Sequence, residues 1–367
     1  MKDVLKLRRL WILLTIPAAF LFILAASRSK SFAEAYATGI YPALSHAGNS
    51  VTGLAPFSVG EIFVYALIVF LLASLIRFVI RMVRGKGKRG ATAVKYIIDL
   101  LCAAGILLFL FTVDCGINYY RSTFAETSGL TVKASPKTEL VALCRSLAGD
   151  AGRLRGETEA DKGGVMKLHF RDFSENAQQA RAALDGLSVK YPLLRSGYSE
   201  PKPVLASRLM SQCNITGMFF PFTFEANVNT DVPEYTIPFT MCHELSHLRG
   251  FMREDEANFI AYLACRSSTD ADFQYSGAVD AFTYASNALF SVDPNTAGKI
   301  YDGLSDGVRR DLQFNSRYWD RFKGPAADAA NSVNNSYLKA NSQSDGVQSY
   351  GRMVDLLLAL QRSEGKS

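Results

Sequence analysis

Three long apolar runs dominate the first third of the chain. Residues 10–26 carry no charge, residues 62–80 are interrupted only by Arg77, and residues 96–113 contain a single charged residue, Asp99. As helices, runs of this length match the hydrocarbon thickness of a bilayer, and buried core helices seldom remain apolar for so long. The pattern therefore predicts three transmembrane helices, at about 10–26, 62–80 and 96–113.

After about residue 122 the apolar positions fall into shorter elements separated by polar intervals. Helical spacing predicts helices at 174–187, 276–290, 295–314 and 346–361, and runs of β-forming residues predict strands at 165–170, 204–210 and 217–228. Pro221 cannot donate a hydrogen bond to a neighbouring strand, so the last strand is expected at an edge or a bulge. We predict an α+β protein with a membrane domain at 1–116, followed by a mostly helical, metallopeptidase-like domain at 117–367 with a small antiparallel sheet.

The basic residues predict an orientation for the three spans. Four basic residues precede the first span, and seven lie from Arg77, near the end of the second span, to Lys95, just before the third. The loop at 27–60 contains only two basic residues, Arg28 and Lys30. Because basic residues accumulate on the cytoplasmic side, the N-terminus and the 84–95 loop are expected in the cytoplasm and residues after the third span outside it. The first span could instead be a cleaved signal peptide ending near Ala25 and Ala26, which would leave the second domain on the same side.

Composition narrows the expected partners. The formal net charge of +6 does not indicate nucleic acid, since much of the positive excess lies in the predicted cytoplasmic segments. The expected partners are the lipid bilayer and a substrate, and the oligomeric state stays open. The 27–60 loop is long enough to carry a short interfacial helix. The six cysteines match no zinc-binding spacing and select no disulfide pairing, and His46 and His169 are interpreted as ordinary surface and sheet residues.

Two of the four histidines form the pattern H-E-x-x-H, as His243, Glu244 and His247. Residues four apart on a helix share one face, with Cβ atoms about 5–6 Å apart, so both imidazoles can bind one Zn²⁺. Glu244 follows the first histidine, where its carboxylate can reach a water activated by the metal. This motif predicts a zinc site with Glu244 as the general base.

A second helical pattern begins near Arg253 and supplies a candidate third ligand. Gly250 can end the first helix in the left-handed conformation, which would allow a tight reversal into the second. Glu254 and Asn258 are four residues apart and share a face, whereas Glu256 lies about 200° further round the helix. We therefore predict Glu254 as the third ligand and Asn258 as a residue that supports the ligands.

Two histidines and one carboxylate leave a fourth zinc position for water, as in zinc hydrolases. Glu244 would take the proton of that water during attack on a carbonyl and pass it to the leaving amine. The oxyanion needs one more donor, for which Tyr262, Tyr235 and Arg249 remain alternatives. The segment Phe224-Glu225-Ala226-Asn227 could pair with an extended peptide substrate, or it could be a structural strand that binds nothing.

The two helices together resemble a known group of enzymes. His243-Glu244-x-x-His247 followed by Glu254-x-x-Ala257-Asn258 is similar to the gluzincin metallopeptidases, whose third ligand is a glutamate in a second helix. The resemblance implies His243, His247 and Glu254 as zinc ligands and Glu244 as the base. The gap of six residues between His247 and Glu254 is shorter than in most gluzincins.

A second resemblance covers nearly the whole chain. The three apolar runs, the H-E-L-S-H and R-E-D-E-A-N-F motifs, and the segments around Pro221, Tyr337 and Asp345 resemble the bacterial membrane family catalogued as domain of unknown function 3810. That family name implies no substrate. The expectation is a membrane-anchored zinc peptidase acting on peptides or proteins outside the cytoplasm. The alternative is a zinc-containing sensor or assembly protein without turnover. Cleavage within the membrane is disfavoured, because the motif lies far beyond the last apolar run in a polar-flanked segment.

Overall fold

Three helices form the membrane-facing end of the molecule. The computed structural model describes residues 8–85, 87–341 and 352–365. Within this part, the segments long and apolar enough to cross a membrane are Leu10–Arg28, Val59–Arg84 and Arg89–Asp114. Most of their side chains face outward, and none of the most apolar part of the second segment is buried. These findings fit the predicted membrane protein, with each helix extending a few residues beyond its apolar run.

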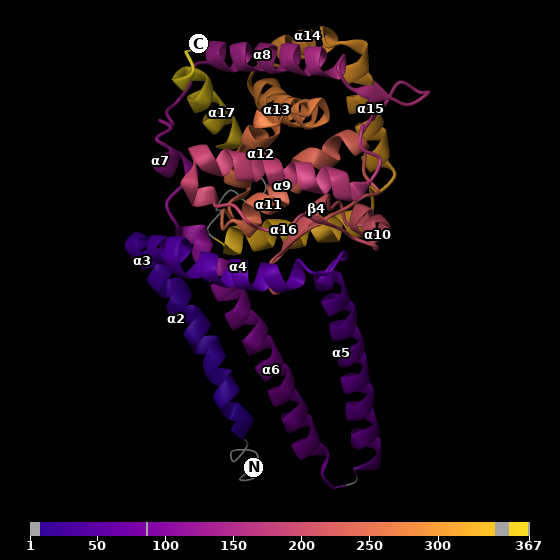
Figure 1. Ribbon diagram of the computed structural model, residues 1–367. Helices are drawn as coiled ribbons and strands as arrows, with labels where there is room; N and C mark the ends of the chain where they lie inside the picture. Colours follow the sequence, from indigo (N-terminus) through magenta and orange to yellow (C-terminus); the bar gives the residue numbers. More distant parts are fainter. Residues whose placement is uncertain (1–7, 86, 342–351, 366–367) are drawn as a thin grey trace.

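Two of the three membrane helices pack together, and the third diverges from them. The first segment comprises a 3₁₀ turn at Arg8–Leu14 and α2 (Thr15–Arg28), and it packs against α6 (Arg89–Asp114). The second segment, α5 (Val59–Arg84), meets α6 near the loop that joins them and diverges from it toward the body of the protein (Figure 1). Outward-facing apolar side chains on these helices indicate that lipid is their natural surrounding.

The segment between the first two membrane helices is itself helical. It consists of α3 (Lys30–Ala35), a π-helical stretch at Tyr36–Ile40, and α4 (Tyr41–Thr52). Figure 1 shows α4 lying crosswise beneath the rest of the protein, at a steep angle to α5 and α6. Ser29 caps α3 by accepting a hydrogen bond from Phe32 N–H, and Tyr36 donates to the carbonyl of Val113 at the end of α6. The loop is thus a helical layer joined to the tops of the spans.

The body above this layer is mostly helical. Helix accounts for 73% of the structure and strand for 4%, so the small sheets are minor elements of the predicted α+β fold. The helices α11 (Ile237–Leu248), α12 (Glu254–Ser267) and α13 (Ala271–Val292) are at its centre, and α8 (Lys137–Arg155) packs along α13. The remaining helices are α7 (Phe124–Ser128), α9 (Phe173–Lys190), α10 (Ser207–Gln212), α14 (Pro294–Asp302), α15 (Asp306–Asp320), α16 (Pro325–Ala340) and α17 (Arg352–Ser363).

Two small sheets complete the body. β1 (Glu159–Ala160) and β2 (Met166–Lys167) form an antiparallel pair. A second sheet has the order β3-β5-β4, in which β5 (Glu225–Val228) is antiparallel to β4 (Gly217–Phe220) but parallel to β3 (Lys202–Pro203). The prediction of one antiparallel sheet is therefore corrected to two sheets, of which the larger is mixed.

Several predicted elements have different boundaries. The strand predicted at 217–228 is two strands joined by a turn that contains Pro221. The strand predicted at 204–210 is wrong, since helix α10 occupies most of it. An apolar run of only one or two helical turns fits a strand as well as a helix, so its sequence alone cannot decide between them. The helix predicted at 295–314 is divided into α14 and α15, because the side chain of Ser305 caps a new helix by accepting from Val308 N–H. Of the helix predicted at 346–361, residues 346–351 lie outside the described residues and the rest belongs to α17.

One continuous hydrophobic core runs from the tops of the spans into the body. It includes Ala26, Tyr36 and Tyr41 from the first part of the chain, together with buried residues of α9, α11, α12 and α13. The six cysteines all lie within the described residues and form no disulfide bond, and five of them are buried. The membrane helices are therefore fixed to the body by packing and hydrogen bonds.

Candidate metal centre

Two consecutive helices carry the candidate ligands. Pro238 stands at the start of α11, where its missing N–H costs no helical hydrogen bond, and the helix ends before Gly250, which has φ of +88° as predicted. A Cβ atom at Gly250 would lie 2.9 Å from the Tyr41 ring, so glycine is also required there by space. The N–H of Gly250 donates to His247 and the N–H of Phe251 to Ser246, which turns the chain sharply toward α12.

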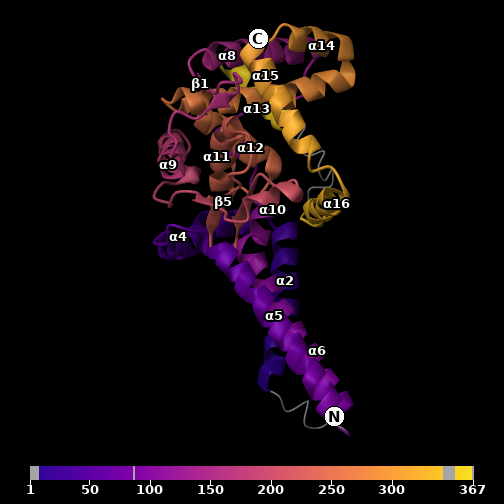
Figure 2. The ribbon, with the colours of Figure 1, turned by 90° about the vertical axis from the view of Figure 1, so that its right-hand side faces the viewer.

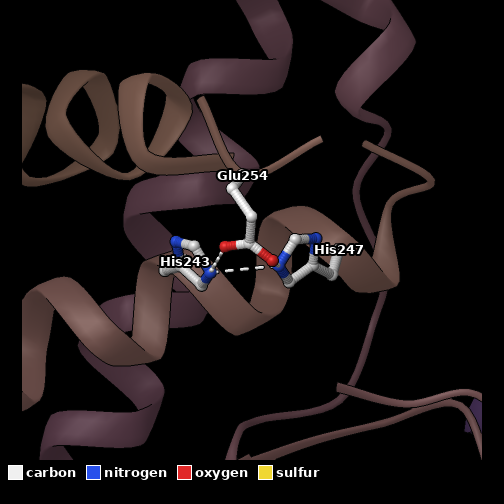
Figure 3. Close-up of side chains that lie close together, drawn as sticks. All are labelled: His243, His247 and Glu254. Atoms are coloured by element: carbon white, nitrogen blue, oxygen red, sulfur yellow. Dashed lines mark hydrogen bonds and ion pairs between the residues drawn. The ribbon is translucent and has the colours of Figure 1, made fainter. Parts of the chain in front are cut away.

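The turn brings His243, His247 and Glu254 together, and we call them the His–His–Glu cluster (Figure 3). The two Nε2 atoms are 3.0 Å apart, His243 Nε2 is 3.3 Å from Glu254 Oε2, and His247 Nε2 is 3.7 Å from Glu254 Oε1. Ligand atoms on a tetrahedral zinc with bonds of about 2.0–2.1 Å stand about 3.3–3.4 Å from one another. These distances, which involve both oxygens of the Glu254 carboxylate, are close to the ligand spacing of a tetrahedral zinc site.

Neighbouring groups orient the two imidazoles. His247 Nδ1 lies 2.8 Å from the carbonyl oxygen of Phe251. Since a carbonyl only accepts hydrogen bonds, Nδ1 carries the proton and the Nε2 lone pair is free for a metal. Asn258 contacts the ring of His243, so the predicted supporting residue is beside the cluster. Asp280 of α13, which sequence reasoning did not select, is a partly buried residue near His243, and its inaccessible Oδ2 atom has no hydrogen-bond partner.

The pKa values describe the electrostatic state of this buried group of residues. Burial opposes a charge on His243, but the hydrogen bond to Glu254 and the charge of Glu244 outweigh it and raise the pKa of His243 to about 9. Burial and the neighbouring His243 lower the pKa of His247 to about 4. Burial raises the pKa of Glu244 and of Asp280 to about 7 each. The site thus has an excess of buried acidic groups that a cation would stabilise.

The candidate base lies between the cluster and the edge strand of the larger sheet. Glu244 is 4% exposed, and its carboxylate accepts a hydrogen bond from the backbone N–H of Phe219 in β4. A Cβ atom at Gly217, the first residue of β4, would lie 2.5 Å from Glu244 Oε1. The absence of a side chain at Gly217 therefore provides the space that Glu244 occupies.

The three predicted oxyanion donors have other partners. The guanidinium of Arg249 is buried and bonded to Asp185 at 2.9 Å and to the carbonyls of Leu245 and Arg195. Tyr262 lies on the same helix as Glu254, but its hydroxyl interacts with Arg266 near α17.

Tyr235 is buried beside Tyr275, with Asp280 and Asp311 as the nearby charges. The structure places none of these hydroxyl or guanidinium groups in contact with the His–His–Glu cluster.

The predicted substrate strand is also placed differently. Phe224 lies in the turn before β5, and Glu225, Ala226 and Asn227 belong to β5, the buried central strand of the sheet. Both edges of β5 are already paired, with β3 and β4, so this strand cannot accept a peptide by strand addition. Among the described residues, β4 pairs with β5 alone, and its other edge is the one at which Phe219 N–H bonds Glu244.

Two tyrosines that the residue-by-residue reasoning did not select lie near Glu254. Tyr119 follows the end of α6, Tyr337 belongs to α16, and their hydroxyls are 2.8 Å apart. The pKa of each tyrosine is raised, mainly by burial of the hydroxyl and in part by the nearby charge of Glu254. Cys115 lies beside this pair, with its Sγ atom 3.8 Å from the Tyr337 hydroxyl and 3.6 Å from the sulfur of Met252 in the turn between α11 and α12. The sequence pointed only to Tyr337, which lies in the C-terminal motif shared with the DUF3810 family. The pairing with Tyr119 could not be predicted, because the two tyrosines are 218 residues apart.

Comparison with models of known protein families finds a match that covers most of the chain. The family model described as Protein of unknown function (DUF3810) matches residues 36–358. The chain belongs to this family. The DUF3810 match contains α4, the last two membrane helices and the whole His–His–Glu cluster, so these features lie inside the family's domain. Its description states no activity, and searches of curated proteins and of solved structures found no match.

Proposed function

We propose that this DUF3810 protein is a membrane-anchored, zinc-dependent peptidase. The observation that carries the proposal is the close approach of the groups in the His–His–Glu cluster. The two Nε2 atoms are 3.0 Å apart, and the two Glu254 oxygens lie 3.3 Å from His243 and 3.7 Å from His247, with the Glu244 carboxylate near His243. The resemblance to gluzincins supports the same roles: His243, His247 and Glu254 as ligands and Glu244 as the base. The orientation expected from the basic residues would put this site outside the cytoplasm.

The charge balance of the site supports a bound cation. The carboxyl group of Glu244 is buried and those of Glu254 and Asp280 are partly buried, and within the described residues the ion pairs of Glu254 are with the two histidines. A buried carboxylate without a cationic partner is strongly destabilising, so an acidic site of this kind favours a metal ion. The protonated His243 of the metal-free protein would lose its proton when zinc binds.

In the proposed reaction, the metal and Glu244 have separate roles in the attack of water on the peptide bond. Bound zinc supplies Lewis-acid activation of water and of the scissile carbonyl. The Glu244 carboxylate would accept a proton from the attacking water and return it to the leaving amine. The Phe219 N–H bond holds that carboxylate in one orientation.

Strand β4 would position the substrate. It is an edge strand of the larger sheet, and its residues Gly217 and Phe219 adjoin Glu244. An extended peptide can add to such an edge through main-chain hydrogen bonds, which would align its backbone with the metal centre. This moves the predicted substrate strand from β5 to its neighbour.

The hydroxyl pair Tyr119–Tyr337 replaces the three oxyanion donors expected from the sequence. Both tyrosines are near Glu254, and their raised pKa values keep them protonated and able to donate. A phenol that donates to the developing oxyanion would act together with the metal.

The test is hydrolysis by purified full-length protein in lipid nanodiscs with zinc. A diverse peptide library is incubated with the wild type and with Glu244→Gln, and products are identified by mass spectrometry. We expect cleavage by the wild type alone, with zinc content equal in the two proteins. Equal cleavage by both would exclude Glu244 as the base, and peptide binding without any product would favour a sensor or assembly protein.

A further inference from the structure

Helix α4 has two faces of opposite character. Its inner face is buried against the body and contains Tyr41, Ser45 and Asn49, which are at most 2% exposed. Its outer face is apolar and open, continuing into the residues after the helix, with exposed fractions of 55% at Ile40, 70% at Val51 and 86% at Leu54. The exposed apolar residues on this side, which we call the α4 face, are Ile40, Leu44, Val51, Leu54 and Phe57.

The composition of this segment is unusual for a protein surface. Residues 35–60 contain no aspartate, glutamate, lysine or arginine. A solvated helix normally carries charged residues on its open side, and a contiguous exposed apolar patch marks a surface that is covered in the functional state. The α4 face therefore requires an apolar covering.

The location of α4 identifies that covering. Figures 1 and 2 both show α4 between the body and the membrane helices, across the direction of the spans. The charge-free stretch runs to Gly60, the second residue of α5, and beyond Glu61 this helix exposes Ile62 and a long run of other apolar side chains. A helix tied at both ends to membrane spans, and lying across them, is at the level of the lipid headgroups.

We propose that α4 is an interfacial helix whose apolar face inserts into the leaflet on the side of the catalytic body. Covering this face with lipid removes its apolar side chains from water, which is favourable. The helix needs no basic residues for attraction to the surface, because the adjoining spans already hold it there.

The same helix supports the metal centre. The Tyr41 hydroxyl donates to the carbonyl of Leu248 at 3.1 Å, in the last turn of α11, next to His247. At the other end, Asn49 Nδ2 donates to Phe224 O at 2.8 Å and Thr52 Oγ1 to Thr223 O at 2.9 Å, in the turn that joins β4 to β5. Lipid insertion of α4 would therefore hold helix α11, which carries His243 and His247, and the turn between β4 and β5 just above the membrane surface.

This position defines a substrate class, an inference that rests on the proposed function. Peptide held at the membrane surface, such as the juxtamembrane segment of an anchored protein or a lipid-linked peptide, would reach β4 without leaving the interface. Free peptide must first find the site from bulk solution. Lipid-anchored peptide is thus the preferred substrate.

Tryptophan fluorescence tests the insertion without any assay of activity. The chain has two tryptophans, Trp11 and Trp319, which are replaced by phenylalanine, and single probes are introduced as Leu54→Trp or Leu44→Trp in full-length protein in liposomes. Ile68→Trp in α5 is the control in lipid, and Phe290→Trp, exposed near the end of α13, is the control in water. Lipids brominated on the acyl chain near the headgroup serve as quencher.

We expect the Leu54→Trp and Leu44→Trp emission to be blue-shifted and quenched by shallow bromines, with deep bromines quenching Ile68→Trp more. Unquenched, water-like emission equal to that of Phe290→Trp would overturn the proposal. Blue-shifted emission without quenching would also overturn it, because a protein partner or second copy would then cover the face.

The substrate class is tested on one peptide cleaved by the wild type, with and without an acyl anchor. We expect faster cleavage of the anchored form in liposomes and equal cleavage in detergent. Equal rates in liposomes would refute the substrate class while leaving peptidase activity intact. If no peptide is cleaved, the proposed function and this preference fail, and the quenching result still decides the position of α4.

Discussion

Glu225 joins the sheet to the second membrane helix, and its replacement gives a quantitative test of the fold around the site. Its carboxylate accepts hydrogen bonds from Val59 N at 3.1 Å and Gly60 N at 2.6 Å, which are the first backbone N–H groups of α5. Lys202 Nζ lies 2.5 Å from the same carboxylate, and both side chains are almost completely buried. The negative charge thus stabilises the positive end of a helix and a buried ammonium group together.

The substitution Glu225→Gln keeps the shape of the side chain and one acceptor oxygen. It leaves the Lys202 ammonium with its hydrogen bond to the Thr52 carbonyl but without a negatively charged partner. Removing one member of a buried ion pair costs about 3–5 kcal/mol. With a change of about 2–4 °C in Tm for each kcal/mol, the melting temperature should fall by roughly 10 °C. The assay is thermal unfolding of the full-length protein in detergent, followed by circular dichroism.

A matched control for Glu225→Gln is a substitution at Glu61, which lies in the first turn of α5 beside Val59 and Gly60. Glu61 accepts from the backbone N–H groups of Leu205 and Ala206 at 2.8 Å each and has no buried cation beside it, so Glu61→Gln should cost only about 1 kcal/mol. The double variant Lys202→Met, Glu225→Gln should recover part of the loss. If Glu225→Gln is no more destabilising than Glu61→Gln, the ion-pair reasoning is wrong. A change in peptide KM without loss of stability would instead support the substrate-binding role expected from the sequence.

Three further predictions concern the site itself. In zinc-free protein at pH 8, Glu244→Gln should stabilise the fold by about 3 kcal/mol, because burial raises the pKa of Glu244 from 4.5 to about 7 and penalises its ionised form. Thermal unfolding should show this gain in full above pH 7 and none below pH 4.5; a gain independent of pH would contradict it. Gly217→Ala should displace the Glu244 carboxylate, whose Oε1 would be 2.5 Å from the new Cβ, and abolish cleavage while zinc content is unchanged. Gly149→Ala, with open space at its Cβ position, is the neutral control. Tyr337→Phe should lower kcat roughly 100-fold with little change in KM if its hydroxyl stabilises the oxyanion; a change confined to KM would assign it to substrate binding.

The features that could be predicted from the sequence are those set by neighbours along the chain. The three spans follow from uninterrupted apolar composition, and the proximity of His243 to His247 follows from helical spacing. The choice of Glu254 over Glu256 needed only the angle between them around a helix. In the structure Glu256 accepts a hydrogen bond from Phe124 N, away from the two histidines.

The features that could not be predicted depend on residues far apart in sequence. Pairing of β3 with β5 makes Glu225 a central, buried residue, and nothing in the local alternation of β5 distinguishes a central strand from an edge. Tyr337 comes to Tyr119 across 218 residues through the packing of α16. The crosswise position of α4 likewise depends on its hydrogen bonds to α11 and to the turn between β4 and β5.

The most direct test of the central claim is X-ray absorption spectroscopy of the purified, zinc-loaded protein, with zinc content measured on the same sample. The His–His–Glu cluster predicts one zinc per chain, with two imidazole nitrogens and oxygen ligands at about 2.0–2.1 Å, and loss of this zinc in His243→Ala. Zinc that is absent from the wild type, bound by sulfur, or retained unchanged in His243→Ala would contradict the metal centre on which the proposed peptidase depends.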